Sequence, residues 1–239
     1  SKRPGPVWID IPLDVQKSEI DANKLKSFKI KKQKKNSLKS NNNINKIIKF
    51  IAKSSRPLIV IGNGVRQSNM ETSIKKIINK MKVPVIFSRF AQDLFSHNEK
   101  YIFGHGGIKG SKHCRKIMNS CDLVLSFGCR FAPQFVGHDF SAFKNAKVIA
   151  VDIEKDEFKK KGQKIDLAIN EDLIFFLPKF LNQINKVKLP NYNNWVSYCY
   201  RLKKENPTIK NKIHKNPIDL YYFMQKLGEV ANKKDILIT

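Results

Sequence analysis

Short apolar runs alternate with amphipathic segments through the middle of this 239-residue chain, and this alternation constrains the fold more than any other feature. The runs at residues 58–61, 83–87, 123–127 and 147–152 are almost continuously apolar, which is typical of strands buried on both faces. Parallel strands need crossover connections, and helices between them supply these. The sequence therefore predicts an α/β fold with a doubly wound, parallel, Rossmann-like sheet.

The remaining elements of this region follow from periodicity and capping residues. A short fifth strand is expected at residues 166–169, and a long polar loop after residue 87. Isoleucines at helical spacing predict a helix from Ile44 to just before Pro57. Three further helices are predicted behind N-caps, at residues 68–81, 111–120 and 170–184, with the caps Ser68, Ser111 and Asn170.

Both ends of the chain carry a predicted strand without neighbours. Residues 7–11 follow a Pro-Gly-Pro turn and stop at Pro12, and residues 235–239 form a second apolar run. A buried strand needs partners on each side, so we expect the chain to be the central portion of a longer protein. Exposed edges of this kind also predict poor solubility for the isolated piece.

The segments that flank the central region have a different composition. Residues 17–44 are rich in Lys, Asn and Ser and are expected to be a linker. Residues 185–216 are expected to be a second connector with a short helix, which has Trp195, Tyr198, Cys199 and Leu202 on one face. A further helix is predicted behind Asn216, with Leu220, Phe223, Met224 and Leu227 as its apolar residues.

The net charge of +26 raises nucleic acid as a partner. However, Lys outnumbers Arg by 39 to 7, whereas specific readers of bases and phosphates favour Arg. A solvated Lys-rich surface is the preferred interpretation, with no nucleic-acid partner, and nucleic-acid binding stays as an alternative. No apolar run approaches the roughly 20 residues that span a bilayer, so neither a membrane partner nor a location outside the cytoplasm is expected.

Cysteine usage gives no sign of a metal site. The four cysteines form no C-x-x-C pair and no His/Cys cluster with metal-ligand spacing. Reduced thiols are the simplest interpretation, and no metal ligand is predicted in this segment.

Polar and glycine residues follow several of the predicted strands. Ligands of open parallel sheets bind beyond the carboxyl ends of the strands, and together these residues predict a nucleotide-sized groove. Each has a simpler interpretation: a tight turn for Gly62-Asn63-Gly64, a surface ion pair for Arg130, a loop cap for Asp152 and a solvated side chain for His105. The chain contains no Ser-His-Asp order, paired cleft carboxylates or P-loop, so no catalytic residue is predicted within it.

Several ordered landmarks carry a family resemblance. They are residues 3–16 (RPGPVWIDIPLDVQ), 56–64 (RPLIVIGNG), 103–107 (FGHGG), 120–131 (SCDLVLSFGCRF) and 148–153. Their order and spacing resemble the central domain of thiamine-diphosphate-dependent enzymes of the acetolactate synthase family. The resemblance implies a 2-keto acid carboligase or decarboxylase that uses thiamine diphosphate and Mg²⁺ and assembles as a homodimer or homotetramer.

The resemblance also implies a division of the chain. Residues 1–16 would end a pyrimidine-binding domain, 17–44 would link it to a central domain at 45–184, and 185–216 would connect this to a diphosphate-binding domain beginning at 217–239. The activating glutamate and the Mg²⁺-binding motif of the family would then lie outside this segment. A stand-alone nucleotide-binding module without catalysis is the alternative.

Some members of the family carry FAD in this domain. By motif position, the FAD-binding residues would be Gly62, Asn63, Gly64, Ser88, Arg89, Gly104, His105, Gly106, Gly128, Cys129, Arg130, Asp152, Ile153, Asp166 and Leu167. The chain departs from the family at residues 131–137, which read FAPQFVG where acetolactate synthases have a run like FDDRVTG. Two acidic residues and an arginine are missing from that run.

Overall fold

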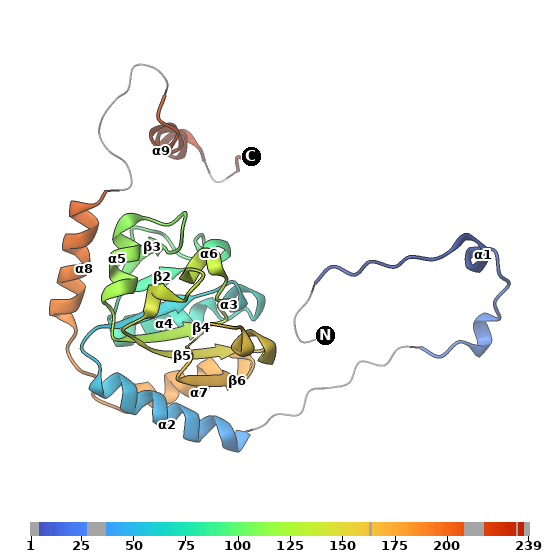
Figure 1. Cartoon of the computed structure of the whole chain (residues 1–239), viewed down its shortest axis with the longest axis horizontal. Coiled ribbons are helices and arrows are strands. Elements are labelled where there is room, and N and C mark those ends of the chain that lie inside the picture. Colours follow the sequence, from blue (N-terminus) through green and yellow to red (C-terminus); the bar gives the residue numbers. More distant parts are fainter. Residues whose placement is uncertain (1–4, 28–36, 163, 208–217, 233, 237–239) are drawn as a thin grey trace.

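A computed structural model describes residues 5–27, 37–162, 164–207, 218–232 and 234–236, and its central part is an α/β body (Figure 1). The described residues form a six-stranded parallel sheet with the order β3-β2-β1-β4-β5-β6. The strands are β1 (Pro57–Ile61), β2 (Val85–Phe87), β3 (Ile102–His105), β4 (Leu123–Phe127), β5 (Lys147–Asp152) and β6 (Leu167–Asn170). The predicted fold class is therefore confirmed.

Helices cover both faces of this sheet, because successive side chains of each strand point to opposite sides. Ile59 and Ile61 of β1 pack in one core cluster with α2 (Ser37–Lys53), α4 (Glu71–Met81) and α7 (Leu173–Asn185). Leu58 and Val60 pack in the other cluster, with α5 (Lys112–Ser120), α6 (Pro133–Val136) and α8 (Asn193–Glu205). Strands that are apolar on both faces thus require both helical layers.

Helix α8 is part of the packed body. The Tyr192 hydroxyl donates a 2.8 Å hydrogen bond to the carbonyl of Ile51 in α2, and the Trp195 indole donates a 2.9 Å bond to the carbonyl of Pro57 in β1. Trp195, Cys199 and Leu202 are buried, so the predicted face of this helix is confirmed. The helix that the sequence placed in a connector is docked on the sheet.

Two elements of the body differ from the predictions. The expected polar loop after residue 87 contains β3, an edge strand that pairs with β2 through a register shift. This strand is only four residues long and contains Gly104 (φ 119°) and His105, so it leaves no continuous apolar run in the sequence. Helix α2 begins at Ser37 rather than Ile44, because polar Lys, Asn and Ser residues extend the helix without extending its apolar periodicity.

Two of the predicted N-caps are wrong. Ser68 ends α3 (Gly64–Gln67), where its hydroxyl donates to the carbonyl of Gly64, and α4 begins only at Glu71. Asn170 is the last residue of β6, and Asp172 caps α7 by accepting from the amide of Ile174. Ser111 does occupy the N-cap position of α5. Capping residues lie close together in these turns, so composition alone does not choose between them.

The flanking segments hold only short elements. Residues 5–12 form no strand, and Trp8 is 92% exposed, because a single strand has no partner for its backbone groups. The other elements are α1 (Leu13–Gln16), the short 3-10 helix Ala22–Lys24 and α9 (Leu220–Val230). Asp219 caps α9, while the predicted cap Asn216 lies outside the described residues. Of the strand expected at 235–239, only residues 235 and 236 are described, and neither is in a strand.

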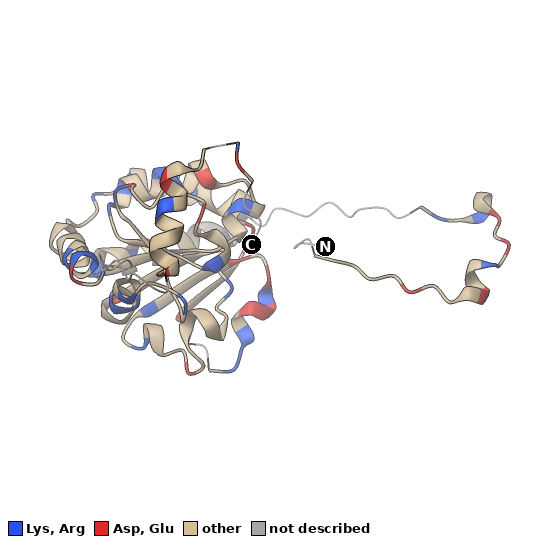
Figure 2. Cartoon of the chain, turned by 90° about the horizontal axis from the view of Figure 1, so that it is seen from above, with Lys and Arg blue, Asp and Glu red and all other residues tan. Residues whose placement is uncertain are grey.

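Lys and Arg positions are spread over the helices and connections in view, with Asp and Glu positions among them (Figure 2). Within the described ranges, no helix is both long enough and apolar enough to cross a bilayer.

Removing the Tyr192 hydroxyl tests the docking of α8. We expect Tyr192→Phe to lower the free energy of unfolding by about 0.5–1.5 kcal/mol, because the carbonyl of Ile51 loses one of two donors and keeps the amide of Ser54. Chemical denaturation measures this change. Tyr221→Phe, on the exposed surface of α9, is the matched control and should be neutral. Equal stabilities of wild type and Tyr192→Phe would contradict the docked arrangement.

Candidate functional site

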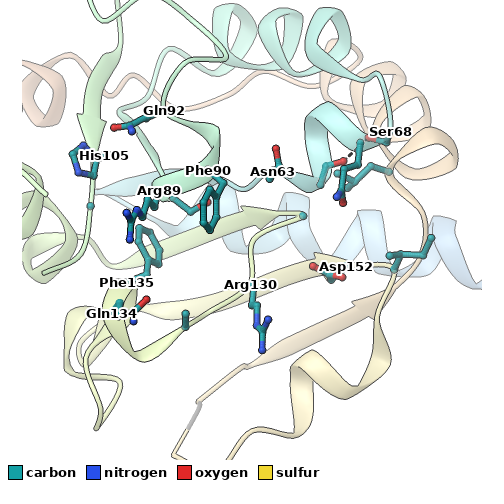
Figure 3. A pocket seen from close by; sticks show the side chains of 18 of the residues that line it. Asn63, Ser68, Arg89, Phe90, Gln92, His105, Arg130, Gln134, Phe135 and Asp152 are labelled. Atoms are coloured by element: carbon teal, nitrogen blue, oxygen red, sulfur yellow. Dashed lines mark hydrogen bonds between the residues drawn. The ribbon is translucent and has the colours of Figure 1, made fainter. Parts of the chain in front are cut away.

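A cavity of about 990 Å³ lies at the carboxyl ends of the strands, where the strand order reverses between β1 and β4 (Figure 3). This switch point is the usual ligand position in a doubly wound sheet. The residues that line the cavity are Asn63, Gly64, Gln67, Ser68, Asn69, Ser88, Arg89, Phe90, Gln92, His105, Gly106, Ile108, Lys109, Gly128, Arg130, Ala132, Gln134, Phe135, Asp152, Ile153, Asp172, Leu173 and Ile174.

The floor of the cavity is a contact between two backbones. The amide of Gly62 donates to the carbonyl of Phe127, and the amide of Gly64 donates to the carbonyl of Gly128, both over 3.0 Å. A Cβ on Gly62 would lie 2.0 Å from the Gly128 oxygen, and a Cβ on Gly64 would lie 2.7 Å from the Gly128 Cα. Gly128 itself has a φ of +57°. Only glycine at these positions lets the ends of β1 and β4 approach this closely.

One end of the cavity is acidic. Asp152, at the end of β5, is 4% exposed, and its Oδ1 atom accepts a 2.9 Å hydrogen bond from the amide of Glu154. The side-chain amide of Asn170 braces the same turn by donating to the carbonyl of Ile153. Asp172 adds a second carboxylate to this end. Carboxylates in such a position accept hydrogen bonds from hydroxyl groups of a ligand.

The opposite end is basic and partly aromatic, with Arg89, Phe90, Lys109 and His105 (Figure 3). The Nε2 atom of His105 lies 3.1 Å from the carbonyl of Lys109. Burial lowers the pKa of His105, and the nearby positive charges of His97 and Arg89 act in the same direction, against the Lys109 carbonyl, which raises it. Phe90 is 72% exposed and offers a face for a flat apolar group.

Arg130 lines the cavity and also forms the surface ion pair expected as its simpler interpretation. Its side chain is 69% exposed, and Nε lies 3.5 Å from Glu157. Glu157 also pairs with Lys160. The guanidinium is thus held at the mouth, where it faces both solvent and the cavity.

The segment that departs from the acetolactate synthase pattern, residues 131–137, forms one wall. Its carbonyl at Gln134 accepts a 2.8 Å hydrogen bond from the amide of Ile108. The ring of Phe135 lies so close to Gly106 that a Cβ there would be 2.9 Å from it. This wall presents Ala132, Gln134 and Phe135 to the cavity, so it is apolar and amide-bearing where the family pattern is acidic.

The structure brings most of the predicted binding residues to this cavity. Those on its lining are Asn63, Gly64, Ser88, Arg89, His105, Gly106, Gly128, Arg130, Asp152 and Ile153. Gly62, Gly104 and Cys129 lie outside the lining. Burial raises the pKa of the Cys129 thiol to about 12.

Asp166 and Leu167 are not brought to the cavity. They lie at the amino end of β6, where Asp166 pairs with Lys147 over 2.9 Å and accepts from the amide of Val148. Asp172 and Leu173, beyond the carboxyl end of the same strand, line the cavity instead. An Asp-Leu pair occurs at both positions, and the sequence alone does not tell which end of the strand each one occupies.

Other lining residues were not predicted from the sequence. Gln67, Ser68 and Asn69 come from the α3–α4 turn, Phe90 and Gln92 from the turn after β2, and Ile108 and Lys109 from the turn after β3. Ile108 and Lys109 were missed because the sequence analysis did not predict β3. This strand ends at His105, so the residues that follow it lie at the edge of the sheet where the cavity is.

The described parts of the chain contain no group of three or more His, Cys, Asp or Glu residues that could hold a metal ion. They also place no nucleophile beside a general base in the cavity. Its side chains are suited to binding and orienting a ligand.

Fold and cavity together define a doubly wound α/β domain with a cavity at its switch point. The family model of the central domain of thiamine pyrophosphate enzymes matches residues 44–180. The chain therefore belongs to the thiamine pyrophosphate enzymes and contains their central domain.

Three relatives illustrate this similarity. The probable acetolactate synthase large subunit of Methanocaldococcus jannaschii is 30% identical over 236 residues, which cover 98% of this chain and 40% of the relative. That of Methanococcus aeolicus is 29% identical, over 85% of this chain and 36% of the relative. The acetolactate synthase large subunit of Lactococcus lactis is 26% identical, over 86% and 35%. The chain thus spans well under half the length of these relatives.

Adding a methyl group to Gly62 tests the floor of the cavity. We expect Gly62→Ala to cost at least the roughly 1–3 kcal/mol typical of an overpacked core, because its Cβ would meet the Gly128 carbonyl. Urea denaturation measures the loss. Gly228→Ala is the control, since no atom lies within 4 Å of the place that its methyl group would take; it should not destabilise the body. An unchanged stability of Gly62→Ala would contradict this backbone contact.

The lowered pKa of His105 predicts a pH dependence of stability. Because the folded state binds the proton less readily than the unfolded state, the contribution of His105 is present above its ordinary pKa of 6.5 and is lost as the pH falls through the lower folded value. We therefore expect wild type to lose more stability on acidification through this range than His105→Gln. Denaturation at a series of pH values measures both slopes, and identical slopes would contradict the prediction.

Proposed function

We propose that the chain is the central part of a thiamine-diphosphate-dependent carboligase or decarboxylase that acts on small 2-keto acids. The match of the central-domain family model to residues 44–180 carries this proposal. When bound, thiamine diphosphate supplies a carbanion and an electron sink for the keto acid. No residue of this chain is proposed to touch that cofactor or its Mg²⁺ ion, so the reacting groups belong to other parts of the whole protein.

In this proposal the central domain has a structural role and its cavity binds FAD or another nucleotide. The residues fit such a group in three respects. Gly64 and Gly128 line the cavity with backbone and no side chain, buried Asp152 offers an acceptor for a ribose hydroxyl, and Arg89 and Arg130 offer charge to phosphates. The altered wall at residues 131–137 does not block the cavity, although it removes acidic groups that the family pattern would place there.

We further propose that the whole protein is a cytoplasmic homodimer or homotetramer, with neither nucleic acid nor membrane as a partner. The mixed distribution of Lys, Arg, Asp and Glu in Figure 2 supports a solvated surface rather than a reading face. A stand-alone nucleotide-binding module without catalysis remains the alternative, because the cavity is built from this chain alone.

Activity of the full-length protein tests the catalytic proposal. We expect carbon dioxide release from 2-keto acids such as pyruvate, dependent on added thiamine diphosphate and Mg²⁺, in a coupled or manometric assay. Omitting either addition should abolish the release. A full-length protein that binds a nucleotide but decarboxylates none of a panel of 2-keto acids would favour the stand-alone module.

Asp152 tests the cofactor cavity. We expect Asp152→Asn to weaken FAD or ADP binding about tenfold, because a neutral amide replaces a charged acceptor of ribose hydroxyls. Isothermal titration calorimetry measures the affinity. Asp156→Asn, an exposed residue paired with Lys159, is the matched control and should bind as wild type does. Unchanged affinity of Asp152→Asn would remove the ribose role.

A further inference from the structure

Arg66 holds two walls of the cavity together, although it does not line the cavity itself. Its Nη1 atom donates to the side-chain oxygen of Asn63 and to the carbonyl of Phe90, each over 3.2 Å. Its Nη2 atom lies 2.6 Å from Asp93. The hydrogen bond from Arg66 is the main cause of the lowered pKa of Asp93. One guanidinium therefore ties the turn after β1 to the turn after β2.

This contact fixes the orientation of the Asn63 amide. A guanidinium has five donors and no acceptor, so the atom of Asn63 that faces Arg66 is the oxygen. Figure 3 shows this oxygen on the side away from Asp152 and Arg130. Among the residues that the structure describes, the Nδ2 atom of Asn63 has no hydrogen-bond partner. Because Asn63 lines the cavity, the polar group that it offers to a ligand is a donor.

The surroundings of Asn63 suit an acceptor-rich, negatively charged ligand group. Arg89 follows β2 and lies on the same side of the cavity as Phe90, whereas Arg130 follows β4 and lies next to Asp152 (Figure 3). Gly64 and Gly128 lie against each other and give this part of the lining backbone without side chains. The acidic residue Asp152 lies toward the other end, so the donors that an anionic ligand group meets away from that carboxylate are those of Asn63 and Arg89 (Figure 3).

We propose that Arg66 is a positioning residue that commits Asn63 to donate, and that Arg66 and Asn63 thereby make the middle of the cavity selective for the diphosphate of a nucleotide. This inference rests on the nucleotide cavity proposed above and names the part of the ligand that it recognises. The shared chemistry is the diphosphate of FAD and of ADP. Adenosine lacks it and is the discriminating probe.

Two substitutions separate this role from a merely structural one. Arg66→Met removes the contact that orients Asn63. Asn63→Asp keeps the shape and strengthens the pairing with Arg66, but it replaces the donor with a negatively charged acceptor. We expect both variants to bind ADP and FAD at least about tenfold more weakly than wild type, and to bind adenosine within about twofold of wild type.

The controls match each change in charge at a site remote from the cavity. Arg201→Met removes an exposed guanidinium of α8 that pairs with Glu205, and Asn194→Asp adds a carboxylate to the exposed face of the same helix. Both should bind all three probes as wild type does. Calorimetric titration of the full chain measures the affinities, and thermal unfolding reports whether each variant is folded.

Each outcome has one meaning. Loss of ADP and FAD binding with adenosine binding retained supports the inference, and Asn63→Asp alone suffices if Arg66→Met fails to fold. Parallel losses for adenosine and ADP, no loss for either variant, or a loss for FAD alone overturn the roles of Arg66 and Asn63 while leaving the cavity intact. Failure of the wild-type chain to bind any of the three probes overturns the nucleotide cavity itself.

Discussion

The site depends on the close backbone contact between the ends of the two central strands. At the point where the strand order reverses, the amide of Gly62 donates to the carbonyl of Phe127 and the amide of Gly64 donates to the carbonyl of Gly128, both over 3.0 Å. No side chain separates them, and none fits. Strands β2 and β5 take their positions from this pair through the parallel ladders on either side. The turns that carry Arg89, Asp152 and Arg130 are therefore fixed relative to one another by main-chain geometry.

Side-chain contacts hold the walls of the cavity in place, and the contacts differ from wall to wall. Arg66 fastens the turn after β2 to the turn after β1, and an Asn170 amide braces the turn after β5. The wall at residues 131–137 rests on the glycine turn after β3 through Phe135 and the carbonyl of Gln134. The floor is constrained by sterics, whereas this last wall is held by packing that many apolar residues can provide. That contrast explains how the chain departs from the family pattern at residues 131–137 and keeps the cavity.

The strands that are buried on both faces were the elements best predicted from the sequence. β1, β4 and β5 were found almost to the residue, because fully buried strands leave a continuous apolar run. β3 was missed because it is a short edge strand with Gly104 and His105 in it. Asp166 was assigned to the site in place of Asp172, since each begins an Asp-Leu pair and only the register of β6 against β5 decides which lies at the ligand edge. The role of Arg66 depends on a contact with residues 24 to 27 positions later, which no local pattern encodes.

The two hydrogen bonds from α8 join groups 141 and 138 positions apart in the chain. Their acceptors are a carbonyl near the end of α2 and the first carbonyl of β1, both of which leave the ribosome before α8 does. A nascent chain that has emerged only as far as α7 holds every strand of the sheet, yet the hydrogen bonds from Tyr192 and Trp195 are still missing and one apolar face lacks its last helix. Completion of the body thus waits for the arrival of Tyr192 and Trp195, so closure of this domain is a late event of its synthesis.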